Sequence, residues 1–384
     1  MSNEWVYFTS EVKKMYKKDN VALHEPTFSE VEVEYVTDCV KSGWVSSVGK
    51  YVERFEKELA EFTGVKRAIA VVNGTAALHI SLKIAGVEAE DEVFMPSLTF
   101  VATANAVSYL GAIPHFVDVS EKTLGIDPVK LENHILQIGE YKGGYLVNKE
   151  TGRIIRAVVP MHTFGHPVEL DELQAVCQKY NLILIEDAAE SLGSYYKGRH
   201  TGSFGKVSAL SFNGNKIITT GGGGAILTND EDLADYAKHI TTTAKIPHRW
   251  AYNHDEVGYN YRLPNINAAL GCAQLEKMQT FVEQKRRITS NYEKLVENIA
   301  GVSLFKEPEY AQSNYWLQTL ILDNTFNRDE VLDFLNDQGV MSRPIWTPLH
   351  LLRPYTNMPT ANLSTTDVLN KHIINIPSTP LREV

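Results

Sequence analysis

The residue best placed for chemistry in this 384-residue chain is Lys216, which follows an apolar run and precedes four consecutive glycines. The run, Val207 to Phe212, has the composition of a buried strand, and Gly221 to Gly224 allow the backbone to approach a flat ligand closely. Burial at a strand end favours the neutral, nucleophilic amine that Schiff-base chemistry requires. An isolated lysine is more often a surface residue before a loop, so this role needs a second supporting feature.

That feature is an acidic pair at the end of another apolar run. Leu182 to Ile185 have the pattern of a central parallel strand, and Glu186 and Asp187 follow at its carboxyl end, where open α/β sheets bind ligands. A buried carboxylate there requires a cationic or protonated partner. Pyridoxal phosphate (PLP) needs both groups, because its pyridine nitrogen pairs with an anion and its aldehyde with a lysine. The pair Asp187 and Lys216 therefore indicates PLP, although either acid alone could be a helix N-cap.

Several other function classes are disfavoured by the composition. The net charge of −10 argues against a nucleic-acid or anionic-membrane surface. The N-terminus lacks the apolar core of a secretory signal, and no apolar run has transmembrane length. Three scattered cysteines form neither a metal pattern nor a disulfide framework, so reduced thiols in a cytoplasmic protein are expected. His162 and His166 lack the accompanying glutamate of a zinc motif, so no metal is expected.

The elements that must position Lys216 and Asp187 alternate between strand and helix from residue 68 to 230, which predicts a mostly parallel sheet between helices. A strand over Ile69 to Val72 turns at Asn73 and Gly74 into a helix from Thr75, and such a helix start binds anions. From about residue 266 one long helix is expected to lead into a smaller α+β unit. We therefore predict a large PLP-binding α/β domain over 1–255, including an N-terminal helix or arm, and a small domain over 256–384.

Seven stretches of the sequence together resemble the nucleotide-sugar aminotransferases of the DegT/DnrJ/StrS type, which are fold-type-I PLP enzymes. They run in the family's order from about residue 20 nearly to the C-terminus. The stretches are GWVSSVGKYVERFEKELAEF, NGTAALHISL, PSLTFVATANAV, HTFGHPVELDEL, IEDAAESLG, SFNGNKIITTGGGGAILTND and GYNYRLPNINAALG.

The resemblance implies a set of site residues. Lys216 would be catalytic and would carry the cofactor, while Asp187 would bind the pyridine nitrogen. Further cofactor contacts are implied as well: Gly74, Thr75, Ala76 and Ser211 would surround the phosphate, Phe100 would stack on the pyridine ring, and Glu190 would lie near the ring hydroxyl. Asn260 would approach the cofactor across a homodimer interface. Substrate contacts are implied for Trp44, Ser46, Arg249, Arg343 and His350, and Arg249 and Arg262 are candidates for binding phosphate.

The implied reaction is a ping-pong transamination with pyridoxamine phosphate as its intermediate. Lys216 would move the proton in both halves, taking it from an amino donor, expected to be L-glutamate, and returning it at C4 of a nucleotide-linked 4-keto sugar. The GNK loop and the GWVSSVGKYV stretch resemble the legionaminic acid and bacillosamine branch, which implies a UDP-linked 2-acetamido-4-keto-6-deoxy hexose and a role in bacterial surface glycans.

Three alternatives stay open. The GDP-linked perosamine synthases, which use a GDP-4-keto-6-deoxymannose, carry a similar GNK loop. Relatives that act as PLP-dependent sugar dehydratases replace the lysine with histidine, which Lys216 disfavours. Regulatory relatives are attached to DNA-binding domains, and this acidic chain shows no such domain.

Overall fold

A seven-stranded β-sheet forms the centre of the computed structural model, which describes residues 3–381. Its strands lie in the order β1, β11, β10, β7, β6, β2, β3, and six of them run parallel. The exception is β11, which pairs antiparallel with both neighbours. The strands are β1 Arg67–Val71, β2 Glu92–Pro96, β3 Ile113–Val117, β6 Ile155–Val158, β7 Ile183–Asp187, β10 Val207–Ser211 and β11 Gly224–Thr228. The predicted mostly parallel α/β sheet is confirmed.

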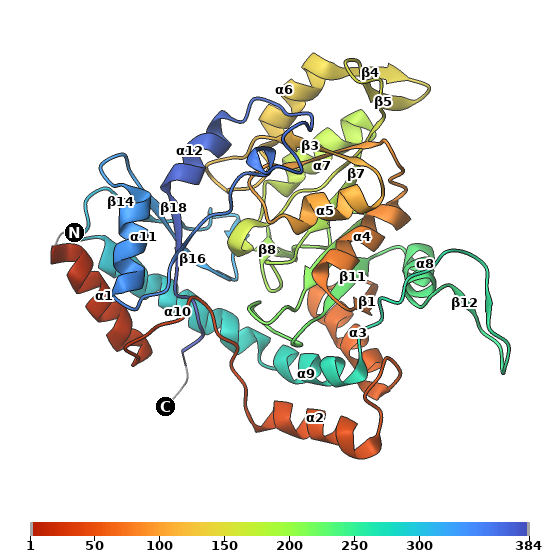
Figure 1. The fold of residues 1–384 in the computed structure, drawn as a ribbon, viewed down its shortest axis with the longest axis horizontal. Helices are drawn as coiled ribbons and strands as arrows, with labels where there is room; N and C mark the ends of the chain where they lie inside the picture. Colours follow the sequence, from red (N-terminus) through yellow and green to blue (C-terminus); the bar gives the residue numbers. More distant parts are fainter. Residues whose placement is uncertain (1–2, 382–384) are drawn as a thin grey trace.

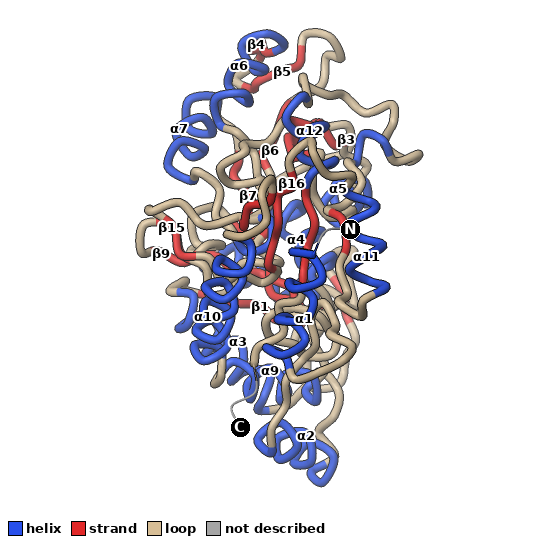
Figure 2. Tube along the Cα trace, turned by 90° about the vertical axis from the view of Figure 1, so that its left-hand side faces the viewer, coloured by secondary structure: helices blue, strands red, loops and turns tan. Residues whose placement is uncertain are grey.

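Helices cover both faces of this sheet because alternate strand residues are apolar on each side. On β7, Ile185 packs into the cluster that includes residues of α4, α5 and α8, whereas Leu184 packs with α6 and α7. Helices α3 and α9 cover the second face around β1, β10 and β11. Figure 2 shows the strands between α7 on one side and α4 and α5 on the other. The helices are α3 Lys50–Thr63, α4 Gly74–Ala85, α5 Ala102–Tyr109, α6 Pro128–Ile138, α7 Leu170–Tyr180, α8 Glu231–Thr241 and α9 Asn265–Leu275.

A second, antiparallel sheet lies in the C-terminal part of the chain, with strands in the order β14, β16, β18, β17. Three helices share its apolar core: α1, α10 and α11. The elements are α1 Asn3–Tyr16, α10 Met278–Val296, β14 Val302–Leu304, β16 Gln318–Leu322, α11 Arg328–Asp337, β17 Arg343–Pro344 and β18 Ile373–Ile376.

The N-terminal helix packs with this C-terminal unit rather than with the large domain to which we assigned it. Trp5, Phe8 and Val12 on α1 are fully buried in the cluster that contains Ile288 and Tyr292 of α10 (Figure 1). These three apolar or aromatic positions of α1 recur at helical spacing, but the sequence pattern does not indicate the surface against which they pack. The boundary at residue 255 stays a prediction.

The expected single long helix from about residue 266 is two helices. α9 ends at Leu275 and α10 begins at Met278, and Lys277 between them has φ −100° and ψ 0°. By contrast, α2 (Glu30–Ser42) has the ends that its sequence predicts. Ser29 and Glu32 form a capping box at its start, and Gly43 ends it with φ 77°.

Two hairpins extend beyond the compact layers. One is formed by β4 and β5, and the other, by β12 and β13, reaches outward beyond α8 in Figure 1. The remaining elements are β4 Gly139–Lys142, β5 Tyr145–Asn148, η1 Thr163–Gly165, β8 Tyr195–Tyr196, β9 Arg199–His200, β12 Lys245–Ile246, β13 Asn253–His254, β15 Ala311–Gln312, η2 Leu349–Leu351 and α12 Ser364–His372. Among residues 3–381, no helix is both long and apolar enough to cross a membrane.

A buried polar network fastens the segment after β5 to the sheet. Glu92 of β2 is fully buried and accepts hydrogen bonds from Asn148 and Thr151, while its Oε2 lies 2.8 Å from His115 Nδ1. His115 Nε2 in turn lies 2.8 Å from His134 Nε2. Burial would raise the pKa of Glu92, but these hydrogen bonds hold it below its ordinary value. The carboxylate is therefore the acceptor at the centre of the network.

We predict that Glu92→Ala lowers the free energy of unfolding by about 3–5 kcal/mol, because it leaves several buried donors without their acceptor. Urea denaturation at pH 7 measures this. The matched control is Glu90→Ala, which breaks an exposed ion pair with Arg153 and should change stability by less than about 1 kcal/mol. Equal losses in the two variants would contradict a special role for the buried network.

Candidate active site

A cavity of about 940 Å³ lies where the carboxyl ends of the central strands meet the C-terminal unit. Parallel strands bring their carboxyl ends to one edge of the sheet, which is why residues distant in sequence meet there. Eight of the predicted site residues line it: Gly74, Thr75, Phe100, Asp187, Glu190, Ser211, Lys216 and Arg343. Residues predicted from separate motifs therefore lie around one cavity, and their roles stay predictions.

Asp187 ends β7 and is almost fully buried. Its Oδ2 accepts a hydrogen bond of 2.8 Å from the Thr103 hydroxyl, and its Oδ1 accepts one of 3.2 Å from the Ala189 N–H. Burial raises the pKa of this carboxyl above its ordinary value, although both hydrogen bonds oppose the shift. No lysine, arginine or histidine described in the structure forms an ion pair with it. The cavity thus contains a desolvated carboxylate suited to a cationic ligand group.

The neighbouring acid, Glu186, has a different environment because adjacent strand residues face opposite sides of the sheet. Its carboxylate accepts hydrogen bonds of 2.7 Å from the backbone N–H groups of Gly202, Phe204 and Gly205. His162 Nε2 lies 3.0 Å from the same carboxylate. Glu186 is therefore fully engaged within the protein, and it anchors the loop before β10.

Lys216 lies in the loop after β10, between two groups of opposite character. Its Nζ is 3.2 Å from Glu190 Oε1 and 3.9 Å from the centre of the Trp316 ring. The Trp316 indole N–H donates a 2.7 Å hydrogen bond to the Asn215 carbonyl, which fixes the ring beside the lysine. A carboxylate and an aromatic face both stabilise an ammonium ion. These two side chains therefore define the position of the amine.

The turn between β1 and α4 has the form of an anion cradle. α4 begins at Gly74, where an added Cβ would lie only 2.7 Å from Ser211 Cβ. On the other side, a Cβ at Gly224 would lie 2.5 Å from the Asn73 carbonyl oxygen. The glycines thus allow the helix start, Ser211 and the glycine run to approach one another, and backbone N–H groups and a hydroxyl there can bind a phosphate.

The structure does not bring the other predicted site residues into the cavity. Ala76 is buried on α4, and its N–H already donates to Asn73 Oδ1 at 2.7 Å. His350 bonds instead to Ser97 Oγ at 2.8 Å. The remaining residues lie on surface loops: Trp44, Ser46, Arg249 and Asn260, of which Trp44 is 58% exposed. Their predicted roles stay predictions, and a single copy of the chain does not supply these contacts.

Three residues at the site were missed by the sequence analysis: Trp316 and His24, which line the cavity, and Thr103, which donates to Asp187. Thr103 follows Phe100 by three residues, so the helical start of α5 could have suggested that it points the same way. Trp316 comes from the segment before β16, and His24 from the extended segment between α1 and α2. Both ring nitrogens of His24 are buried without a hydrogen-bond partner. Burial, followed by the nearby charges of Lys285 and Lys216, holds its pKa well below the ordinary range, so the imidazole is neutral.

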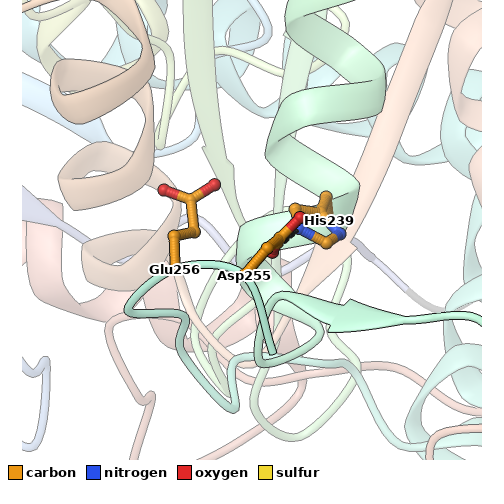
Figure 3. A group of neighbouring side chains, drawn as sticks. All are labelled: His239, Asp255 and Glu256. Carbon is orange, nitrogen blue, oxygen red and sulfur yellow. Dashed lines mark hydrogen bonds and ion pairs between the residues drawn. The ribbon is translucent and has the colours of Figure 1, made fainter. Parts of the chain in front are cut away.

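One group of metal-ligating side chains lies outside the cavity. Figure 3 shows His239, on α8, beside Asp255 and Glu256, which follow the outer hairpin. His239 Nε2 lies 2.7 Å from Asp255 Oδ1, and the Tyr236 hydroxyl donates to Glu256 Oε2 at 3.0 Å. Protein groups thus already engage these side chains, and both acids are exposed. The cluster ties the hairpin to α8 and does not contribute to the cavity.

Residues 26–383 match the DegT/DnrJ/EryC1/StrS aminotransferase family. The chain belongs to this family. It is 40% identical over 338 residues to the Bacillus subtilis (strain 168) protein EpsN, whose assignment as a pyridoxal phosphate-dependent aminotransferase is itself provisional; this covers 88% of the chain and 83% of EpsN. It is 37% identical over 360 residues to the GDP-perosamine synthase of Escherichia coli O157:H7, covering 94% and 93%. The structure resembles a DegT DnrJ EryC1 StrS aminotransferase from Brucella abortus with a TM-score of 0.83 and 30% identity over 91% of each chain.

Family membership makes PLP the expected cofactor, and the cavity fits it. Bound there, PLP supplies an electron sink for the carbon that gains or loses a proton. Asp187 offers the anion for the ring nitrogen, and Lys216 offers the amine for the aldehyde. Ser211 and the backbone at Gly74 and Thr75 offer the phosphate cradle, since all three line the same cavity. One copy of the chain thus offers groups for these three parts of the cofactor.

We predict that Gly224→Ala weakens PLP binding about tenfold or more, because its Cβ would displace the backbone at Asn73 and overpacking costs about 1–3 kcal/mol. Titration of the apoprotein with PLP, followed by visible absorbance, measures this affinity. The control is Gly222→Ala in the same glycine run, where the nearest atom to an added Cβ is 3.9 Å away. Equal weakening in both variants would show that the run matters for flexibility rather than for close approach.

Proposed function

We propose that this protein is a PLP-dependent aminotransferase acting on C4 of a nucleotide-linked 4-keto-6-deoxy sugar. The observation that carries the proposal is that Lys216 and the desolvated carboxylate of Asp187 line the same cavity of about 940 Å³. A volume of this order accommodates a cofactor together with a small substrate. Family membership narrows the reaction to transamination of sugars.

The proposed chemistry assigns one proton carrier to both halves of the reaction. The Lys216 amine takes the α-proton of an amino donor, which we expect to be L-glutamate, and later returns a proton to C4 of the sugar. Arg343 lines the cavity and forms no ion pair among the described residues, so its guanidinium is free for a carboxylate or phosphate. Trp316 and Trp346 provide aromatic walls against which a sugar ring can pack.

Two nucleotide sugars are candidates. A UDP-linked 2-acetamido-4-keto-6-deoxy hexose follows from the resemblance of the GNK loop and the 43–52 stretch to the legionaminic acid and bacillosamine branch. A GDP-linked 4-keto-6-deoxymannose is favoured by a different observation: three relatives, at 36–37% identity, are GDP-perosamine synthases. The first is our proposal, and the second is the alternative that the experiment must separate from it.

A homodimer with shared active sites is part of the proposal. It is supported by the exposure of the predicted contacts that lie outside the cavity, and by the apolar side chains around the outer hairpin. Trp250, Tyr252 and Val257 are 73%, 78% and 81% exposed. Several large apolar side chains exposed to water on one segment are typical of a protein–protein contact surface. Arg249 and Asn260 lie in the same region and would reach the cavity of the second copy. This arrangement accounts for site residues that one chain leaves on its surface.

We predict that the protein loaded with L-glutamate converts the UDP-linked 4-keto sugar to a 4-amino sugar, detected by mass spectrometry.

Lys216→Ala should reduce the rate by at least about 10³-fold, because the amine is both attachment point and base. Asp187→Asn should weaken PLP binding by about 10–150-fold through loss of a charged hydrogen bond. Conversion of only the GDP-linked sugar would establish the alternative, and normal turnover by Lys216→Ala would refute both.

We predict that mixing Lys216→Ala with a double variant, Arg249→Ala with Asn260→Ala, restores activity that neither has alone. Hybrid dimers then contain one undamaged site, which gives up to about a quarter of wild-type activity after random exchange. Separate kinetics of Arg249→Ala should show a raised KM for the nucleotide sugar. Absence of any recovery after exchange, confirmed by mass spectrometry of hybrids, would contradict a shared site.

A further inference from the structure

We propose that Glu190 is a catalytic acid–base partner of Lys216, which takes the proton of the lysine ammonium and returns it during turnover. This inference rests on the proposed transamination, because it concerns the amine that moves the proton there. It assigns to Glu190 a role distinct from contact with the cofactor ring. The evidence is the arrangement of this carboxyl group, which is almost fully buried in the cavity.

The two carboxylate oxygens of Glu190 have separate partners. Oε1 lies 3.2 Å from Lys216 Nζ, and Oε2 accepts a 2.9 Å hydrogen bond from the Phe164 N–H. Phe164 holds φ at 55°, a left-handed conformation that costs about 1–3 kcal/mol for a residue with a side chain. The Asn314 amide donates at 2.9 Å to the Glu190 carbonyl and so fixes the backbone. The segments around Phe164 and Asn314 therefore hold Glu190 so that Oε1 faces the Lys216 amine.

The charges around Glu190 leave its proton affinity close to that of a base working near neutral pH. Burial raises the pKa of Glu190 to about 7, while Lys216 and the Phe164 N–H oppose the shift and Asp187 adds to it. Asp187 and His24 are further titratable groups that interact electrostatically with Lys216, and His24 is neutral. The centre of the Trp316 ring lies 3.9 Å from the amine nitrogen of Lys216.

Glu186 shows what a purely structural buried glutamate requires in this same fold. It accepts three backbone N–H hydrogen bonds and faces His162, and these groups hold its pKa below the ordinary value despite burial. Glu190 receives one backbone N–H bond, and its other oxygen is directed to the reactive amine. A carboxylate meant only to anchor the loop would be expected to have the first environment.

The proton transfers balance without any further reactant. When Lys216 must act as a base, its N–H bond breaks and an O–H bond forms at Glu190 Oε1, which leaves a neutral amine beside a neutral acid. The amine would then accept the α-proton of the donor and pass it to the bound cofactor, which would leave the first half-reaction in its pyridoxamine form. In the second half-reaction the amine would take a proton back from the cofactor and give it to C4 of the sugar, and Glu190 would re-protonate the amine. Glu190 thus holds the one proton that Lys216 must give up before it can take another.

The test compares Glu190→Gln with wild type in single-turnover reactions with L-glutamate alone, monitored by the visible absorbance of the cofactor. In wild type the rate should rise as pH increases through about 7, the pKa of Glu190, because below it the pair holds two protons and Lys216 cannot be relieved of its own. In Glu190→Gln this rise should disappear and the rate fall by about 10²–10³-fold. Glu276→Gln, a control at an exposed ion pair with Arg54, should keep the wild-type profile.

A second readout needs no substrate. Infrared difference spectra of the PLP-bound protein should show a carboxylic-acid C=O band that titrates near neutral pH in wild type and is absent from Glu190→Gln. A slower Glu190→Gln variant with an unchanged pH profile, or an unchanged infrared titration, would overturn the inference and reduce Glu190 to a positioning residue. If wild type accepts no amino donor, the proposed function fails, and the infrared titration still decides whether Glu190 holds the proton.

Discussion

The site depends on one buried carboxylate that the protein leaves without a cation. Asp187 has only the Thr103 hydroxyl and the Ala189 N–H as hydrogen-bond donors, and burial raises its pKa. Removing a carboxylate from water is costly, and two neutral donors offset the cost incompletely. A ligand with a cationic nitrogen would offset the remaining desolvation free energy of the carboxylate on binding. The cavity thus contains a carboxylate that favours such a ligand, and Lys216 and Ser211 line the same cavity.

The alternation of side chains along β7 gives Asp187 and Glu186 different environments. Glu186 and Asp187 are adjacent on β7, and their side chains point to opposite sides of the sheet. Glu186 meets backbone N–H groups of the loop before β10, whereas Asp187 faces Thr103 of α5. A shift of β7 by a single residue would exchange the two environments. The pairing of β7 with β10, in which Asp187 lies beside Ala209, therefore sets which acid is available for chemistry.

The sequence predicted those parts of the site that lie on local motifs at strand ends. Gly74 and Lys216 follow apolar runs and Ser211 ends β10, and the convergence of parallel strands brings such ends together without knowledge of the packing. It did not predict Trp316 or His24, because these reach the cavity through the packing of segments hundreds of residues apart. For the same reason the amphipathic pattern of α1 indicated a helix but not its partner α10. Asn260 lies on the surface of one copy, so its contact with the cofactor across a homodimer interface stays a prediction.

Trp316, which contacts Lys216, is bound in turn by a second buried amine, that of Lys285. Lys285 of α10 is fully buried, and its Nζ donates to the carbonyls of Trp316 and Ser378 and to the Ser378 hydroxyl. Burial without an acidic partner holds the pKa of Lys285 far below its ordinary value. Ser378 also donates its N–H to the Leu23 carbonyl, next to His24.

Lys285 therefore links the two cavity residues that the sequence did not reveal. Trp316 and His24 belong to separate segments, and both segments are joined to the end of the chain at Ser378. The surroundings of the Lys216 amine therefore depend on contacts outside the large sheet. The position of that amine between Glu190 and Trp316 is thus a property of the assembled chain. This explains why a motif around Lys216 can predict a reactive residue but not the Trp316 ring that contacts its amine.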